Sequence, residues 1–158
     1  MKYLIGLLLC LVFQPSYAKQ SLPKNCSHLE GATKANFVLF SKTEFIQLGE
    51  CLAISFIKKK VQLNFVESCN EVDEDRRNLL GIFSLSKYEA ILIGQCKGII
   101  DYIYQHYDNE PVNSNSNRSY SQALYHCTKG IEAVDRIRQS STTLTTRTDL
   151  RNLLCTKS

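Results

Sequence analysis

The apolar positions of the chain are most concentrated between Ser86 and Tyr107, and we predict that this stretch is the central helix of the fold. On a helix of 3.6 residues per turn, its isoleucine, leucine and tyrosine side chains cover almost the whole circumference. A narrow polar stripe with a spacing of four is formed by Lys97, Asp101 and Gln105. Ser86 and Glu89 have the S-x-x-E spacing of a capping box, which marks a helix start. The pattern therefore predicts a helix that is surrounded by other helices.

Two glycines interrupt this helix at positions 94 and 98, on one line of its surface. Glycine lowers helix propensity, so a compensating role is expected for these two residues. We predict that they allow the backbone of a neighbouring element to approach closely along that line. Because Lys97, Asp101 and Gln105 lie near its centre, the stretch does not read as a membrane span.

A second helix start lies at Ser41, which also has a glutamate, Glu44, three positions later. Phe40 and Phe45 have the spacing of a hydrophobic staple across the first turn. The helix that follows carries one apolar face and ends near a run of three lysines, whose positive charges suit a helix C-terminus. The residues of this face are Phe45, Leu48, Leu52 and Phe56, and the lysines are Lys58, Lys59 and Lys60.

Three further segments show helical spacing. Between Val61 and Phe83 the acidic run Glu71–Asp75 interrupts the apolar positions, so we predict two short helices with a break near Asn70–Asp75. An amphipathic helix is predicted for Tyr120–Gln139, and a last short helix for Asp149–Leu154 after a cap at Thr148. The inward positions expected for the Tyr120–Gln139 helix are Leu124, Cys127, Ile131, Val134 and Ile137.

These elements predict an all-α fold, a disulfide-stabilised bundle of about five to six helices. A weak internal echo links SKTEFIQLGEC (41–51) with SKYEAILIGQC (86–96), with a cysteine at the same offset from each cap. Chance similarity is at least as good an explanation of this match as duplication. If the two helices run antiparallel, their cysteines meet at the crossing, so we favour a Cys51–Cys96 disulfide.

The N-terminal segment 1–18 has the pattern of a secretory signal: Lys2, an apolar stretch, and the small-x-small sequence Ser16-Tyr17-Ala18. Its removal takes Cys10 away and leaves one helical domain, residues 19–158, with six cysteines. An even number of cysteines in an exported chain of this size predicts three disulfides, for which fifteen connectivities exist. The six are Cys26, Cys51, Cys69, Cys96, Cys127 and Cys155. We therefore expect a periplasmic or secreted protein without a membrane span.

The composition and the motifs of the chain argue against nucleic-acid binding, metal binding and catalysis. The formal net charge of +4 comes from mixed charges along the chain, with no basic stripe that indicates nucleic acid. Cys26-x-His28 and His126-Cys127 are fragments of metal sites, but we expect these cysteines to form disulfides, which leaves no zinc ligands and no free thiolate. Hydrolase and phosphate-loop motifs are absent from the sequence, so we predict no enzyme, no cofactor and no metal. Asn25 and Asn117 lie in glycosylation sequons that matter only in a glycosylating host.

Two passages resemble the periplasmic immunity proteins of type VI secretion amidase effectors, which are small, exported, helical and disulfide-bonded. These passages are ILIGQCKGIIDYIYQHYD (91–108) and ALYHCTKGIEAVDRI (123–137), about a third of the chain. The sequence differs from that family in its six mature cysteines and in a C-terminal helix that ends at Cys155. The resemblance implies an inhibitor whose protruding loop or helix end enters the cleft of a peptidoglycan amidase, and it implies a homodimer.

The segment Asp108–Ser119 is the expected partner-binding loop. It follows the most constrained helix, and a binding loop with a rigid base loses less entropy on association. Pro111 stiffens it, carboxylates supply negative charge, and asparagines supply donors and acceptors. The candidate partner-binding residues are Asp108, Asn109, Glu110, Asn113, Asn115 and Asn117. A solvated connector explains the same composition, and the acidic run Glu71–Asp75 is the next candidate.

Two other functions fit the sequence. A secreted helical bundle with three disulfides can carry a small apolar ligand, for which the isoleucines and tyrosines of the central helix are suitable lining, although they equally suit a solid core. An exported interaction protein with another kind of partner is also consistent with the sequence.

The cysteine count generates the first prediction. Alkylation of the exported protein without reductant, followed by mass spectrometry, is expected to label no cysteine, because all six form disulfides. Labelling of two or more cysteines would contradict it.

Overall fold

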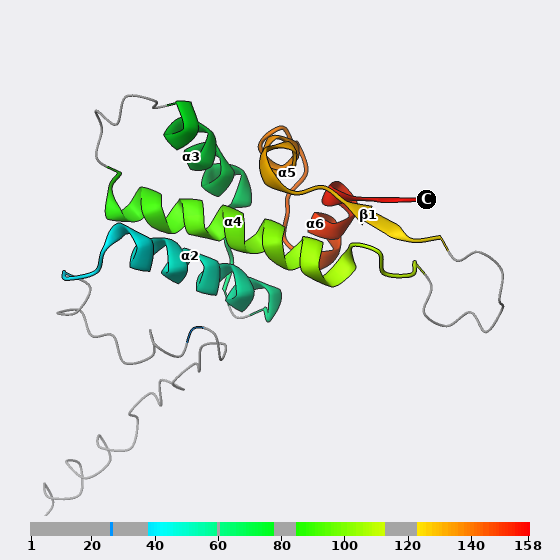
Figure 1. Ribbon diagram of the computed structural model, residues 1–158, viewed down its shortest axis with the longest axis horizontal. Helices are drawn as coiled ribbons and strands as arrows, with labels where there is room; N and C mark the ends of the chain where they lie inside the picture. Colours follow the sequence, from blue (N-terminus) through cyan, green and yellow to red (C-terminus); the bar gives the residue numbers. More distant parts are fainter. Residues whose placement is uncertain (1–25, 27–37, 60, 78–84, 113–122) are drawn as a thin grey trace, which may run out of the picture.

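Five helices and a two-stranded sheet make up the part of the chain that the computed structural model describes, which is residues 26, 38–59, 61–77, 85–112 and 123–158 (Figure 1). The helices are α2 (Lys42–Ile57), α3 (Phe65–Arg77), α4 (Lys87–Tyr107), α5 (Gly130–Arg138) and α6 (Arg147–Leu154). The strands are β1 (Tyr125–Cys127) and β2 (Cys155–Lys157). The predicted all-α class is confirmed, with the small sheet as an addition. The expected signal segment 1–18 lies outside the described residues, and none of the described helices is long and apolar enough to cross a membrane.

Helix α4 is the central element, as predicted. It runs along the length of the molecule, with α2 on one side and α3 and α5 on the other (Figure 1). Ile99 and Ile103 are completely buried in the main core, together with residues of α3, α5 and α6. Both predicted capping boxes are present, at Ser41 with Glu44 and at Ser86 with Glu89. The helix starts therefore follow from local sequence alone.

Helices α2 and α4 pack in parallel, which corrects the antiparallel arrangement that we expected. The contact pairs show the direction: Gly94 lies against Ile46, and Gly98 lies against Glu50 further along both helices. Helix α3 makes this possible because it leads the chain back toward the end at which α4 begins (Figure 1).

The glycines of α2 and α4 lie where the two backbones touch. A Cβ atom on Gly94 would overlap the carbonyl oxygen of Ile46, and a Cβ on Gly49 would overlap that of Ile91. A Cβ on Gly98 would lie 2.7 Å from the Cα of Glu50. The two similar segments, 41–51 and 86–96, therefore face each other about an approximate local two-fold axis. Each supplies a glycine, Gly49 or Gly94, that lets the backbone of the other helix approach closely.

The three disulfides are Cys26–Cys51, Cys69–Cys96 and Cys127–Cys155, so the favoured Cys51–Cys96 pair is wrong. The helix geometry explains the error. Each cysteine stands two positions after the interfacial glycine, about 200° around the helix, and so points away from the α2–α4 contact. Cys51 bonds to Cys26 on the outside of α2, and Cys96 bonds to Cys69 of α3 on the other side.

Helix α3 continues through the acidic run, where we predicted a break. Asp73, in the middle of that run, is buried, and its carboxylate pairs with Arg138 of α5 at 2.9 Å and with Arg76 at 2.8 Å. Arg138 also donates to Asn70 at 3.1 Å. One acidic residue therefore ties α3 to α5, and the run is a helix face with an internal charge rather than a loop.

The predicted helix Tyr120–Gln139 is also wrong in its first half. Residues 113–122 lie outside the described part, and the chain then forms β1, which pairs antiparallel with β2, with Cys127 opposite Cys155. The helix begins only at Gly130, whose φ of 61° is left-handed and ends the extended segment. Val134 and Ile137 are buried as expected, but Ile131 is 41% exposed. The apolar spacing before Gly130 comes from strand and turn residues.

Helix α6 begins at Arg147, two residues before the predicted start. Its cap is Thr146 rather than Thr148: the Thr146 hydroxyl accepts from the Asp149 N–H at 3.1 Å, and the Asp149 carboxylate accepts from the Thr146 N–H at 2.8 Å. Hydrogen bonds donated to its carboxylate, first by the Thr146 side chain and then by the backbone N–H groups of Thr146 and Thr145, hold the pKa of Asp149 below its ordinary value. A T-x-x-D capping box was therefore the local signal for this helix.

The glycine contact generates the second prediction. Gly94→Ala is expected to lower the free energy of unfolding by about 3 kcal/mol, because the new methyl group meets backbone that cannot move aside. Alanine's better helix propensity, about 1 kcal/mol, offsets only part of this cost. Urea unfolding followed by circular dichroism measures the change.

Gly130→Ala is the matched control. A Cβ there meets nothing within 4 Å, so only the left-handed backbone opposes the change, with an expected cost of about 1 kcal/mol. Equal losses in the two variants would show that the α2–α4 contact is not the constraint.

Candidate functional site

The predicted binding loop leaves the body at a small antiparallel hairpin that follows α4. The Asn109 N–H donates to the Tyr125 carbonyl at 2.8 Å, the Tyr125 N–H donates to the Glu110 carbonyl at 2.9 Å, and the Val112 N–H donates to the Ala123 carbonyl at 2.9 Å. On the other edge, Leu124 exchanges backbone hydrogen bonds with Ser158. We call residues 108–112 and 123–127 the hairpin base. The Cys127–Cys155 disulfide and β2 hold it from behind.

Asp108 has a structural role in the hairpin base. One of its carboxylate oxygens accepts from the Cys127 N–H at 3.0 Å, and the other accepts from the Asn109 side chain at 2.9 Å. Asn109 has a left-handed backbone, with φ at 63°, which turns the chain out of α4. Glu110 is exposed. Three of the predicted binding residues, Asn113, Asn115 and Asn117, lie outside the described residues.

Tyrosines and cations gather around the last turns of α4, beside the hairpin base. We call this group the basic–aromatic cluster. Its members are Tyr102, Tyr104, His106, Tyr107, Tyr125, Lys129, Arg147 and Arg151. They come from α4, β1, the residue before α5, and α6, so the tertiary structure brings together four separate segments.

Most of the cations in this cluster are held by aromatic rings. The Arg151 guanidinium lies 5.0 Å from the centroid of Tyr125 and 5.5 Å from that of Tyr107, and Lys129 lies 4.6 Å from that of Tyr104. The Arg151 Nε is buried and has no hydrogen-bond partner among the described residues. Such cation–π contacts fix the direction of a cation without neutralising its charge.

Arg147 extends the cluster toward α2. Its guanidinium lies 5.9 Å from the centroid of Tyr107, and a hydrogen bond with the Tyr102 side chain raises the pKa of Arg147 above its ordinary value. The ring of Tyr102 stacks on the ring of His106 at 3.8 Å. Arg147 is exposed, and within the described ranges it forms no ion pair with a carboxylate.

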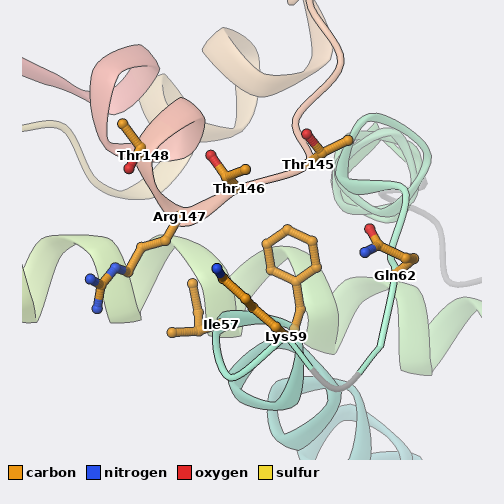
Figure 2. Close-up of a pocket in the computed structure, with 8 residues that line it drawn as sticks. Ile57, Lys59, Gln62, Thr145, Thr146, Arg147 and Thr148 are labelled. Carbon is orange, nitrogen blue, oxygen red and sulfur yellow. The ribbon is translucent and has the colours of Figure 1, made fainter.

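A cleft of about 670 Å³ adjoins Arg147, between the end of α2 and the entrance to α6 (Figure 2). Its lining residues are Phe56, Ile57, Lys59, Gln62, Thr145, Thr146, Arg147 and Thr148. Figure 2 shows that they come from two walls, with Ile57, Lys59 and Gln62 on one side and the Thr145–Thr148 segment on the other. The cleft therefore presents cationic, hydroxyl and amide groups beside the apolar surface of Phe56 and Ile57.

The opposite end of the molecule, at the start of α4, is acidic. Glu71 has a raised pKa because of burial first, and then because of Glu74, Glu89 and Glu67 nearby. The Tyr88 hydroxyl donates to Glu67 at 3.0 Å, and this hydrogen bond raises the pKa of the exposed tyrosine. The acidic run thus divides between this surface and the buried Asp73.

Nothing in the described part gathers three or more histidine, cysteine or carboxylate groups in a geometry that could hold a metal ion. The six cysteines among the described residues are all in disulfides, so none of them provides a thiolate. His28 lies outside the described residues, and His126 is exposed on β1. Cys26 and Cys127, the cysteines of the two histidine–cysteine fragments, are therefore in disulfides and do not supply a nucleophilic thiolate.

Comparison of the chain with protein-family models, with curated proteins and with solved structures finds no match.

The cations beside the hairpin base were not predicted from the sequence. Lys129, Arg147 and Arg151 are isolated in the sequence, and no spacing rule joins them to the tyrosines of α4. The tyrosine run itself was the available signal, because half-buried tyrosines at a helix end are suitable partners for cations.

The hairpin base generates the third prediction. Asp108→Ala is expected to lower the free energy of unfolding by about 2 kcal/mol, because the Cys127 N–H loses a charged acceptor. Glu110→Ala, which removes an exposed carboxylate from the same turn, is expected to change it by less than about 0.5 kcal/mol. Thermal and urea unfolding of both variants measure this difference, and equal stability of the two would show that Asp108 does not anchor the hairpin.

Proposed function

We propose that the protein is an exported, non-catalytic binding protein that inhibits a peptidoglycan amidase of the kind delivered by type VI secretion systems. It acts in the periplasm or outside the cell after loss of segment 1–18, and it uses no cofactor. The amidase is the partner that the family resemblance implies.

The basic–aromatic cluster is the observation that carries this proposal. Tyrosine and arginine are enriched where protein interfaces derive most of their binding energy. Here they are concentrated at one end of the molecule, beside a hairpin. Arg147 and Lys129 are exposed and contact rings rather than carboxylates, so their charges remain for an acidic group on a partner.

The hairpin base supports the predicted binding loop. Backbone hydrogen bonds on both edges, and the disulfide behind it, fix both ends of the segment between Val112 and Ala123. A preformed base lowers the entropy lost on association. Asn109 and Glu110 lie exposed at this base. Asn113, Asn115 and Asn117, which lie outside the described residues, are the other residues that we propose for contact with the partner. Asp108 belongs to the base as a support.

The three disulfides support export, because such bonds persist in oxidising compartments. The alternative function, transport of a small apolar ligand, has less support. Ile99, Ile100 and Ile103 of α4 belong to the packed core, and the cleft described above is lined mainly by polar side chains. A homodimer follows from the family resemblance alone and has no further observation behind it.

The fourth prediction tests inhibition. Purified mature protein is expected to suppress peptidoglycan cleavage by at least one member of a panel of purified type VI amidase effectors. Arg147→Glu is expected to weaken this inhibition at least tenfold, since it reverses a charge in the cluster and places like charges against an acidic partner. Lys42→Glu, an exposed substitution at the start of α2, is the matched control and is expected to inhibit as the natural protein does.

Lack of inhibition of every amidase would contradict the amidase proposal. Inhibition that Arg147→Glu leaves unchanged would place the working surface elsewhere.

A further inference from the structure

The cleft between α2 and α6 has a consistent charge. Lys59 and Arg147 lie on its opposite walls, and none of the lining residues that the structure describes carries a carboxylate. The Asp149 carboxylate, in the first turn of α6, accepts hydrogen bonds from the N–H groups of Thr145 and Thr146 at 3.2 Å and 2.8 Å. The first-turn N–H groups of α6 at Arg147 and Thr148 have no acceptor within the helix, and they favour an anion on this side.

Lys59 occupies a position that favours glycine. It follows the C-cap of α2 with a φ of 57°, and its N–H donates to the Phe56 carbonyl at 2.8 Å. Helices commonly end with glycine in this left-handed conformation, because a side chain there costs conformational energy. The chain accepts that cost at a residue whose ammonium group extends between the two walls of the cleft (Figure 2). Strain of this kind is characteristic of functional positions.

Besides its two cations, the cleft offers apolar and hydrogen-bonding groups to a ligand. Phe56 and Ile57 contribute apolar surface next to the two cations, and Gln62 and the threonines contribute hydrogen-bonding groups. The volume of about 670 Å³ is far larger than a simple anion requires and is in the range of pockets that bury a drug-sized ligand, so it leaves room for a carboxylate together with a neighbouring side chain.

We propose that this cleft binds an acidic segment of a protein partner, in which a carboxylate pairs with Lys59 and Arg147 and a neighbouring apolar side chain packs on Phe56 and Ile57. The inference rests on the proposed function in taking a protein as the ligand, and it adds that the partner's contacting segment is acidic. The cleft is then a second contact site in the same interface, separate from the hairpin base.

Two peptides test the site directly. Acetyl-Leu-Glu-Leu-amide and its isosteric counterpart acetyl-Leu-Gln-Leu-amide are titrated into the ¹⁵N-labelled mature protein, and the amide signals are followed by NMR. The glutamate peptide is expected to shift the signals of Thr146, Arg147 and Thr148 in a saturable manner. Its affinity is expected to be about fivefold higher than that of the glutamine peptide, the difference that one exposed charge pair supplies.

Variants of two adjacent lysines separate the cleft from general charge effects. Lys59→Gln is expected to abolish the preference for glutamate, whereas Lys58→Gln, which removes the same charge from an exposed residue outside the cleft, is expected to retain it. Lys59→Gly is expected to raise the melting temperature, because glycine relieves the left-handed strain, and to lose the same preference. Equal binding of the two peptides, or equal effects of the Lys58 and Lys59 changes, would overturn the proposal.

The peptide experiment and the amidase experiment fail independently. Amidase inhibition without preference for the glutamate peptide overturns the cleft proposal and leaves the inhibitor intact. Peptide binding that depends on Lys59, with no amidase inhibited, supports the acidic-segment site and excludes the amidase as its source.

Discussion

The backbone contact between α2 and α4 is the constraint on which the rest of the structure depends. Gly49, Gly94 and Gly98 allow the two helices to touch without intervening side chains, and this contact fixes both their rotation and their register. Once the glycines face inward, helix geometry turns Cys51 and Cys96 outward, to opposite sides of the pair. One disulfide then joins Cys26 to α2, and the other joins α3 to α4.

Each disulfide joins cysteines that are neighbours in the order along the chain, with separations of 25, 27 and 28 residues. In the chain-entropy account, closing a loop of this length stabilises the folded state by roughly 3.5 kcal/mol. The three bonds act in different parts of the fold. Cys26–Cys51 and Cys69–Cys96 stabilise the helices that pack beside α4, and Cys127–Cys155 links the two strands behind the hairpin base. The end that carries the basic–aromatic cluster is therefore held independently of the glycine contact.

Charge is distributed along the axis of α4. Its N-terminal end lies beside Glu67, Glu71 and Glu89, and its C-terminal end is surrounded by Lys129, Arg147 and Arg151. This polarity matches the macrodipole of the helix, which favours anions at its start and cations at its end. The arrangement contributes to stability, and it also presents a cationic, aromatic surface next to the hairpin and the cleft, which is where we place the binding function.

The sequence by itself determined the elements whose signals are local: the central helix, the capping boxes at Ser41 and Ser86, the staple of Phe40 on Phe45, and the participation of six cysteines in disulfides. Tertiary structure decided what depends on direction and partners. Because α2 and α4 pack in parallel with their glycines inward, Cys51 and Cys96 point away from each other and the expected Cys51–Cys96 pair does not form. Arg138 pairs with the buried Asp73, and α3 continues through the acidic run. Pairing with β2 made a strand of residues that have helical spacing. The cleft, too, depends on the tertiary structure, because Lys59 and Arg147, far apart in sequence, line opposite walls at the end of α2 and the start of α6, a relation that no local pattern encodes.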